Sequence, residues 1–177
     1  MTGSPTARWY AVAVHARSER AAADGVVRVV DEVFLPVRLD RRAWSDRVQT
    51  VEVPLFPGYL LVRTTMSAEK RVELLKVKHV YDVVGRTAGR VDVAPSVPDV
   101  EVTSLQTLLA HERALDPVEK LQPGVAVVVV VGPLKGVRGF IEKASDGQRR
   151  LVVSIALLGR GVRTVLHADD VLEDVSV

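Results

Sequence analysis

The side chains with the greatest capacity for acid–base or metal chemistry are four histidines, and they are scattered along the chain. None of them has a second histidine or a Glu-x-x-His arrangement at helical spacing; they are His15, His79, His111 and His167. The sequence contains no cysteine, which excludes disulfides and thiolate sites and fits a reducing compartment. These residues predict no catalytic constellation, no metal site and no cofactor.

Three glycines follow an apolar run with a spacing similar to that of a phosphate-binding loop: Gly132, Gly136 and Gly139. They lack the Gly-Lys-Ser/Thr sequence that such a loop needs, and a second predicted strand follows them rather than a helix. The sequence therefore predicts a tight turn between two strands at this place, and no nucleotide site.

A second kind of chemistry, aromatic contact with a partner, is indicated at Pro54–Val62. Pro54 and Pro57 fix their own φ and push the preceding residues into extended conformations. Gly58 can adopt positive φ, and the residues after it form an apolar strand. This stiff elbow places Phe56 and Tyr59 at the start of a strand, where their rings serve either the core or a contact surface for a protein partner.

Length and composition limit the classes of protein that this chain can represent. Its 177 residues allow one large domain or two small ones, and a hydrophobic content of 47% is enough for a core. The longest apolar run, Val125–Val131, is too short to span a membrane, and no signal peptide follows Met1–Arg8. We expect a soluble cytoplasmic protein without a membrane partner. A net charge of +2 requires any nucleic-acid contact to come from local patches.

The first part of the chain predicts an α+β unit. Its strands begin with Trp9–His15 and end with Val80–Val84, and its helices follow Ser18, Ser67 and Pro98. The predicted order is β-α-β-β-α-β-α, and the first six elements are those of a ferredoxin-like split unit with an antiparallel sheet.

A hairpin is predicted between the strands Glu32–Val37 and Val48–Val53, with the charged connection Arg38–Asp46 between them. The connection is either a solvated loop or a nucleic-acid-binding tip, because arginines beside an aromatic ring suit phosphates and an unstacked base. The candidate residues for the second role are Arg38, Arg41, Arg42, Trp44 and Arg47.

The second part of the chain predicts a small β-barrel. A polar linker at 113–120 contains Asp116-Pro117, which ends any preceding helix. Five short strands separated by glycine turns follow in 121–177, as in small barrels. We therefore expect a first domain at 1–112, a linker at 113–120 and a barrel domain at 121–177.

Three motifs together resemble the NusG-type transcription elongation factors: Trp9-Tyr10, Phe56-Pro57-Gly58-Tyr59, and the loop from Gly132 to Gly139, which is similar to a KOW motif. The resemblance implies an N-terminal ferredoxin-like α/β sandwich and a C-terminal SH3-like KOW β-barrel. It also implies docking on the clamp helices of the largest subunit of RNA polymerase, and a hairpin facing upstream or non-template DNA. In such a protein the barrel recruits a ribosomal protein of the small subunit or the termination factor Rho.

The resemblance also assigns candidate residues. The polymerase-binding residues would be Trp9, Tyr10, Phe56, Pro57, Gly58 and Tyr59. Lys70 and Arg71 would add a basic helix face to this site; the alternative is that this face is only solvated. The KOW loop would be Gly132, Pro133, Lys135, Gly136, Arg138 and Gly139. The second partner would contact Leu157, Leu158, Gly159 and Arg160, unless the leucine pair is buried.

Two features concern the subtype. The segment from Arg41 to Arg47 is similar to that of the UpxY and RfaH members of the family, which are specialised antiterminators. The barrel, however, has an intact Gly-Arg loop, which is shared with the housekeeping members. The run of valines in Val125–Val131 disfavours refolding of the barrel into helices. We expect a specialised, monomeric paralogue. The alternative is an RNA-binding, ribosome-associated KOW protein, which the nearly balanced charge of the barrel disfavours.

Overall fold

The computed structural model describes residues 6–85, 94–111, 114–122, 124–143, 146–167 and 170–175. Contacts divide the chain into two compact units, each built from separate segments. Unit 1 comprises Met1–Leu35, Phe56–Val102 and Ile155–Leu158, and unit 2 comprises Pro36–Leu55, Thr103–Ser154 and Gly159–Val177. The domain limits expected from the sequence stay a prediction. The sequence also predicts a loop at 87–95, and its residues 87–93 lie outside the described part of the chain.

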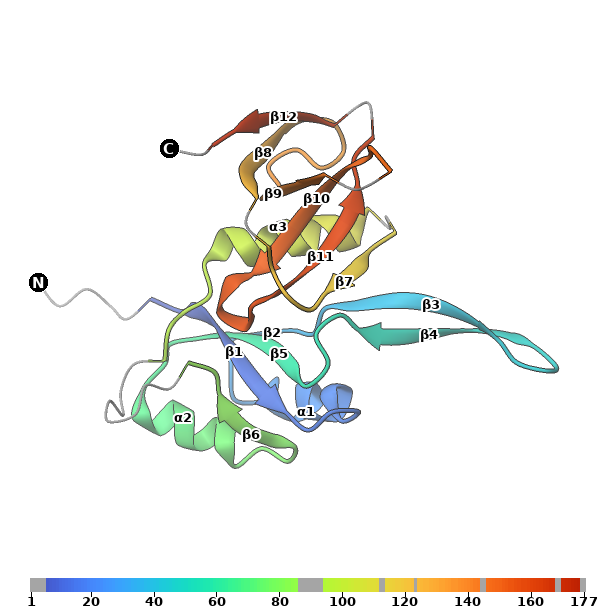
Figure 1. Ribbon diagram of the computed structural model, residues 1–177. Helices are drawn as coiled ribbons and strands as arrows, with labels where there is room; N and C mark the ends of the chain where they lie inside the picture. Colours follow the sequence, from blue (N-terminus) through green and yellow to red (C-terminus); the bar gives the residue numbers. More distant parts are fainter. Residues whose placement is uncertain are drawn as a thin grey trace, which may run out of the picture. The chain divides into compact units, whose positions relative to one another are not determined.

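Unit 1 contains a four-stranded antiparallel sheet with the order β2-β5-β1-β6. The strands are β1 (Arg8–Val14), β2 (Glu32–Phe34), β5 (Tyr59–Thr64) and β6 (Val80–Val83). Two helices, α1 (Glu19–Val26) and α2 (Ala68–Leu75), lie against one face of this sheet (Figure 1). The core between sheet and helices includes Val12, Leu60 and Leu74, all fully buried. The predicted α+β sandwich is confirmed.

The two helices follow their local sequence signals with small differences. Ser67 caps α2, because its hydroxyl accepts a hydrogen bond of 3.1 Å from the Lys70 backbone N–H. Ser18 precedes α1 without such a bond. Gly25 is needed within α1 because a Cβ there would lie 2.7 Å from the side chain of Val77. The apolar pattern of the sequence predicts that Ala68, Val72 and Leu75 share one face of this helix. In α2 the buried side chain is instead Leu74, and Val72 is 49% exposed.

The hairpin differs from the prediction at its first strand. Pro36 separates β2 from a new strand, β3 (Val37–Ala43), which pairs with β4 (Val48–Pro54) from Val37↔Pro54 to Ala43↔Val48. Most of the predicted connection is therefore strand, and the arginines lie along a two-stranded ribbon rather than only at its tip (Figure 1). A ribbon with two accessible faces lacks the hydrophobic alternation by which a half-buried strand is recognised.

Unit 2 also contains a six-stranded antiparallel sheet with the order β12-β8-β9-β10-β11-β7. Its strands are β7 (Asp116–Val118), β8 (Val125–Val131), β9 (Arg138–Lys143), β10 (Arg149–Ile155), β11 (Arg160–Val165) and β12 (Val171–Asp174). The expected barrel strands are present, and β7 adds a strand inside the segment predicted as linker. The sequence predicts the third barrel strand over Leu151–Leu157, but β10 ends at Ile155 because a 3₁₀ helix occupies Ala156–Leu158.

Close approach of strands explains two glycines of the barrel. A Cβ on Gly139 would lie 2.3 Å from the carbonyl oxygen of Val152, and one on Gly161 would lie 2.6 Å from that of Val153. Any other residue at either place would push neighbouring strands apart.

The third helix is α3 (Asp99–Ala110). The apolar pattern of the sequence predicts that Val102, Leu105 and Leu109 share one face, whereas the buried residues are Val102, Leu105 and Leu108. Within unit 2, its buried Ser104 accepts a hydrogen bond of 2.9 Å from the Arg138 backbone N–H. The second half of α3 is thereby fastened to the start of β9.

Candidate interaction surfaces

The elbow at Phe56–Tyr59 is a tight turn. The Phe56 carbonyl accepts a hydrogen bond of 3.0 Å from the Tyr59 N–H, and Gly58 has φ 83°. Proline in the second position and glycine with positive φ in the third are the requirements of a type II turn. The fixed φ of Pro57 and the positive φ open to Gly58 are the properties from which the sequence predicts a stiff elbow here.

Two further hydrogen bonds fix this turn to the sheet and to α1. The Gly58 N–H donates to Glu19 Oε1 at 2.9 Å, and the Gly58 carbonyl accepts from the Val14 N–H at 2.9 Å. Glu19 is only 5% exposed, so its carboxylate is a buried tether. Nothing local in the sequence reveals this contact, because Glu19 and Gly58 lie 39 residues apart in the chain.

The aromatic residues assigned to polymerase binding are divided between two faces of the sheet. Tyr10 belongs to the helix-covered core. Trp9 in β1 and Tyr59 in β5 lie on the opposite face of the sheet, because successive side chains of a strand point to opposite faces. Trp9 and Phe56 are buried, with Phe56 only 2% exposed, while Pro57 is exposed and Tyr59 half-buried. The accessible part of the elbow is therefore the Pro57–Tyr59 side of the turn.

The two basic residues of α2 make contacts within unit 1. Lys70 Nζ donates to the Val29 carbonyl at 2.8 Å and forms an ion pair with Glu73. Arg71 forms an ion pair of 2.9 Å with Asp82. On the same helix, the pKa of the exposed Glu69 is lowered by hydrogen bonds from its backbone N–H and from Ser67. These contacts reduce the capacity of α2 to serve as a free basic surface.

The β3–β4 ribbon presents exposed cations. The side chains of Arg41, Arg42 and Arg47 are exposed, and their guanidinium groups make no hydrogen bond or ion pair within the part of the chain that the structure describes. Trp44 lies at the tip of the ribbon and is 60% exposed. The tip is closed by a hydrogen bond of 2.8 Å from the Trp44 N–H to the Arg47 carbonyl. Cations beside an exposed indole are suited to a nucleic-acid backbone and an unstacked base.

Arg38 has a different role from the other arginines of the ribbon. Its guanidinium pairs with Asp40 at 3.1 Å and donates to the Leu115 carbonyl at 3.1 Å, within unit 2. It anchors the base of the ribbon, so three of the four predicted arginines remain available for a ligand.

The KOW loop is a compact turn whose basic side chains face outward. Leu134 and Val137 are buried, while Lys135 and Arg138 are exposed. Gly132 and Gly136 have positive φ, and the Gly136 N–H donates to the Val129 carbonyl at 2.7 Å. The predicted tight loop is present, and it joins the two strands β8 and β9.

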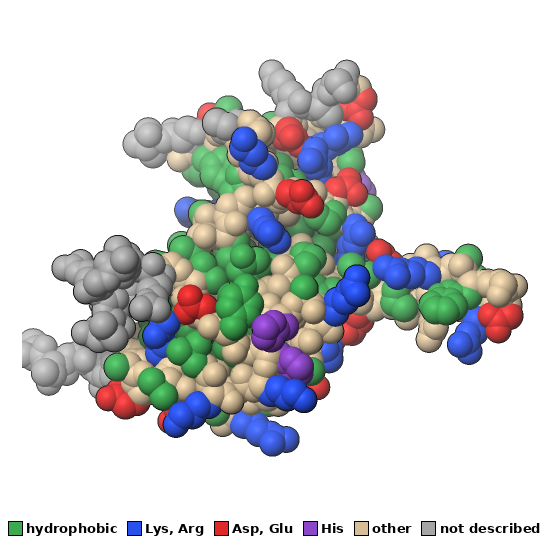
Figure 2. Space-filling view, turned by 60° about the horizontal axis from the view of Figure 1, so that its bottom comes forward, with side chains coloured by type: hydrophobic (Ala, Val, Ile, Leu, Met, Phe, Trp, Pro, Cys, Tyr) green, Lys and Arg blue, Asp and Glu red, His purple; other side chains and the backbone are tan. Residues whose placement is uncertain are grey.

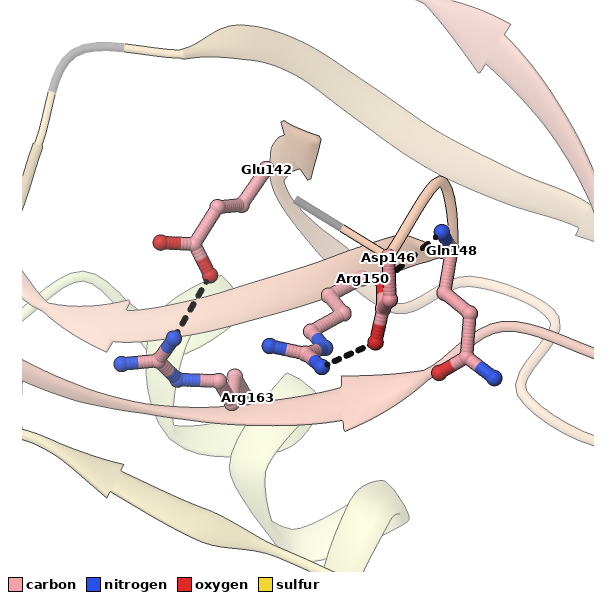
Figure 3. A network of polar contacts seen from close by, with 5 residues as sticks. All are labelled: Glu142, Asp146, Gln148, Arg150 and Arg163. Carbon is pink, nitrogen blue, oxygen red and sulfur yellow. Dashed lines mark hydrogen bonds and ion pairs between the residues drawn. The ribbon is translucent and has the colours of Figure 1, made fainter. Parts of the chain in front are cut away.

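Two ion pairs reduce the free positive charge of the barrel surface. Arg163 pairs with Glu142 at 3.0 Å, and Arg150 pairs with Asp146 at 2.9 Å (Figure 3). Asp146 also accepts a hydrogen bond from the Gln148 N–H, which closes the turn at Gly147. The charge of Arg150 is thus paired with that of Asp146 within the barrel.

The candidate partner-binding residues lie at the 3₁₀ helix and the start of β11. Leu157 and Leu158 are half-buried, Gly159 has φ 62°, and Arg160 begins β11. Within unit 1, the Ala156 N–H donates to Glu101 Oε2 at 3.2 Å. Burial of Glu101 raises the pKa of its carboxyl, and the bond from Ala156 opposes this in part.

Replacement of Glu101 by glutamine should raise stability at neutral pH. Because the pKa of Glu101 is higher in the folded chain, its neutral carboxyl stabilises the fold below the ordinary pKa of about 4.5. This stabilisation is lost as pH rises through the raised pKa, because the buried carboxyl then becomes charged. Glutamine keeps an acceptor for Ala156 without charge. Melting temperatures of both proteins between pH 4 and pH 7 should diverge in favour of Glu101→Gln as pH rises; parallel curves would contradict this.

Some chemistry is absent from the residues that the structure describes. Among them, no group of three or more histidine, aspartate or glutamate side chains could hold a metal ion. In the same residues, no helix is long and apolar enough to cross a membrane.

A cluster that the sequence did not reveal lies at the end of β1, where the ring of His15 lies near the rings of His79 and Tyr81. The histidines appeared isolated because their contact joins positions 64 residues apart. Only pairing of β1 with β6 brings them together.

A helix-covered antiparallel sheet with an apolar turn, a basic ribbon and a small glycine-dependent barrel define a protein of the NusG fold class. The profile described as "Transcription termination factor nusG" matches residues 7–106. The chain is 28% identical to the transcription termination/antitermination protein NusG of Vibrio cholerae over 178 residues, covering 94% of this chain and 96% of the relative. It is 27% identical to that of Escherichia coli K12 over 187 residues, covering 97% and 98%.

A solved structure titled "Domain interaction in Thermotoga maritima NusG" is similar over 98% of this chain and all of that chain, with a TM-score of 0.55 and 22% identity. That likeness supports the two-part fold. The chain belongs to the NusG family and is a NusG-type transcription factor.

Proposed function

We propose that this protein is a transcription elongation and antitermination factor that binds RNA polymerase through its N-terminal part. The contact is the Pro57–Tyr59 side of the elbow, seated on the clamp helices of the largest subunit. The observation that carries the proposal is the turn itself, which three hydrogen bonds to Gly58 and Tyr59 hold in one conformation. A preorganised aromatic turn loses little conformational entropy on binding.

The β3–β4 ribbon contacts upstream or non-template DNA in this proposal. The free guanidinium groups of Arg41, Arg42 and Arg47 bind phosphates, and Trp44 stacks on an unpaired base. The arginine-rich tip supports assignment to a specialised UpxY- or RfaH-like paralogue rather than a housekeeping factor.

The barrel recruits a second partner through Leu157, Leu158, Gly159 and Arg160. That partner is a ribosomal protein of the small subunit or Rho, and the protein acts as a monomer in the cytoplasm, where bacterial transcription takes place. Its role is regulatory and not enzymatic. The alternative, a ribosome-associated RNA-binding protein, is weakened because Arg150 and Arg163 are paired with carboxylates.

A pull-down of core RNA polymerase by the full-length chain tests the proposal. Tyr59→Ala should reduce the polymerase retained by at least about tenfold, because one buried aromatic anchor contributes about 2 kcal/mol or more. Trp44→Ala is the matched control, since it removes a large ring from the ribbon and should leave polymerase docking unchanged. Retention of polymerase by Tyr59→Ala at the wild-type level would remove the elbow from the interface. Failure of the wild type to bind would favour the ribosomal alternative.

A further inference from the structure

The hydrogen-bond pattern of the β3–β4 ribbon determines which way its backbone groups point. At one end the Leu55 N–H donates to the Pro36 carbonyl at 2.9 Å, and at the other end the Trp44 N–H donates to the Arg47 carbonyl at 2.8 Å. Both pairs continue the register of the ladder, along which hydrogen-bonded and non-hydrogen-bonded pairs alternate. The even-numbered residues of β3 therefore bond to β4, and the odd-numbered residues direct their N–H and C=O groups away from it.

The outer edge of β3 is open. Among its outward backbone groups are those of Val37, Leu39 and Arg41, and the ribbon is a sheet of two strands, so among the described residues no third strand covers this edge. Within the part of the chain that the structure describes, these outward groups make no hydrogen bond. A row of unpaired N–H and C=O groups is a template on which another chain can form a strand.

A cavity of about 690 Å³ lies along this edge, within unit 2. Its lining includes every residue from Val37 to Arg41. Successive side chains of a strand point to opposite faces, so a cavity lined by consecutive residues runs along the edge of the strand rather than over one face. The lining also includes Leu109, near the end of α3, and Leu115, which directly precedes β7. The volume is typical of ligand sites.

The side chains at the edge specify what kind of segment fits it. Leu39 is 65% exposed, and Leu109 adds apolar surface to the cavity. The guanidinium of Arg41 is exposed and unpaired in the described residues, whereas Arg38 and Asp40 pair with each other at 3.1 Å. Figure 2 shows hydrophobic side chains beside lysine or arginine side chains along the ribbon, at the right of the view. A complementary ligand offers apolar groups, a negative charge and a row of backbone donors and acceptors.

We infer that the outer edge of β3 binds an extended segment of a partner protein, which adds to the ribbon as a third, antiparallel strand. The segment carries an acidic residue opposite Arg41 and apolar residues opposite Leu39 and Val37, and its backbone pairs with the outward groups of β3. Nucleic acid would neutralise Arg41 but has no ladder of N–H and C=O groups. A second copy of β3 does not satisfy the pattern, because its own outward residues, Val37, Leu39, Arg41 and Ala43, include no acid.

This inference is independent of polymerase binding, so the experiment uses the full-length chain alone. The probe is the peptide acetyl-Glu-Thr-Val-Thr-Val-amide, whose glutamate lies opposite Arg41 and whose valines lie opposite Leu39 and Val37 in antiparallel pairing. A second peptide carries a methyl group on the backbone nitrogen of the central valine, which removes the N–H that would bond to the Leu39 carbonyl. A third peptide has lysine in place of glutamate. Heteronuclear NMR follows the backbone amide signals of the protein during each titration.

The amide signals of Val37, Leu39 and Arg41 should shift most with the first peptide, and the other two peptides should bind about tenfold more weakly. The inference is overturned if these amides do not shift, or if the methylated or the lysine peptide binds as well as the first. It is also overturned if a short oligonucleotide shifts the amides of Val37 and Leu39 as strongly as the first peptide does. Shifts that grow with protein concentration in the absence of peptide would assign the edge to a second copy instead.

Two proline variants test the edge from the side of the protein. Leu39→Pro removes an N–H that points away from β4, which an edge strand tolerates, and should weaken binding of the first peptide about tenfold. Val48→Pro is the matched control, because Val48 lies opposite Ala43 and directs its N–H to the other edge of the ribbon. It should bind the peptide within about twofold of the wild type. Leu39→Ala keeps the N–H and should lose less affinity than Leu39→Pro. Circular dichroism checks the fold of each variant, and equal affinity of the two proline variants would overturn the inference.

Discussion

A protein with Arg41, Arg42 and Arg47 replaced by serine should bind a transcription-bubble DNA roughly 10²-fold more weakly at low salt, without losing RNA polymerase. These guanidinium groups are exposed and unpaired in the described structure, so each is available to a phosphate. Each lost phosphate contact lowers the slope of log affinity against log salt by about 0.7–0.9, so the slope should fall by about two to three. Fluorescence anisotropy at several salt concentrations measures both quantities.

The matched control removes the same charge from the barrel. The side chains of Lys135, Arg138 and Arg149 are exposed and unpaired in the described residues, and their replacement by serine changes the net charge equally. If the barrel variant loses as much DNA affinity as the ribbon variant, general charge rather than the ribbon governs binding. If polymerase docking is lost with the ribbon arginines, the division of labour between elbow and ribbon is wrong.

Phe56→Ala should destabilise the protein by about 3–5 kcal/mol, the usual cost of removing a buried phenylalanine. Phe56 is 2% exposed, so the loss includes both its transfer from water and the cavity that remains. Urea denaturation followed by circular dichroism measures the change in the free energy of unfolding. This expectation differs from that of an exposed aromatic contact, whose removal would leave the fold intact.

Phe140→Ala provides the comparison for this experiment. Phe140 is 37% exposed on β9, and its removal should cost markedly less than that of Phe56. A loss of less than about 1 kcal/mol for Phe56→Ala would show that the ring is poorly packed and free to contact a partner. A large loss would make Tyr59 rather than Phe56 the correct residue for testing polymerase binding, because a polymerase assay on an unfolded variant is uninformative.

Local sequence determined the elements whose signals are short in range. Proline and glycine at Pro57 and Gly58 predict a turn with positive φ, and this turn is present. The Ser67 cap, the valine strand Val125–Val131 and the glycine loop of the barrel were predicted for similar reasons. Each depends on the intrinsic preference of a few adjacent residues, so neighbours far along the chain do not alter it.

The ribbon shows where local preference ceases to be sufficient. The segment from Arg38 to Ala43 is charged and looks like a loop, yet it is paired strand. Its conformation is fixed by hydrogen bonds to β4 and by Arg38 at the Leu115 carbonyl, 77 residues away in sequence. The sequence indicates the arginines and Trp44 as candidate site residues, and only this pairing decides how they are arranged along two strands.

The sequence by itself determined the family, the two-part α+β and barrel architecture and the positions of the elbow, ribbon and loop. Only the tertiary structure decided which side chains remain accessible. It placed Phe56 in the interior, tied Gly58 to Glu19, engaged Arg38, Lys70 and Arg71, and joined His15 to His79 and Tyr81. Turn and strand signals depend on neighbouring residues, whereas burial and ion pairing depend on groups that only the folded chain brings together.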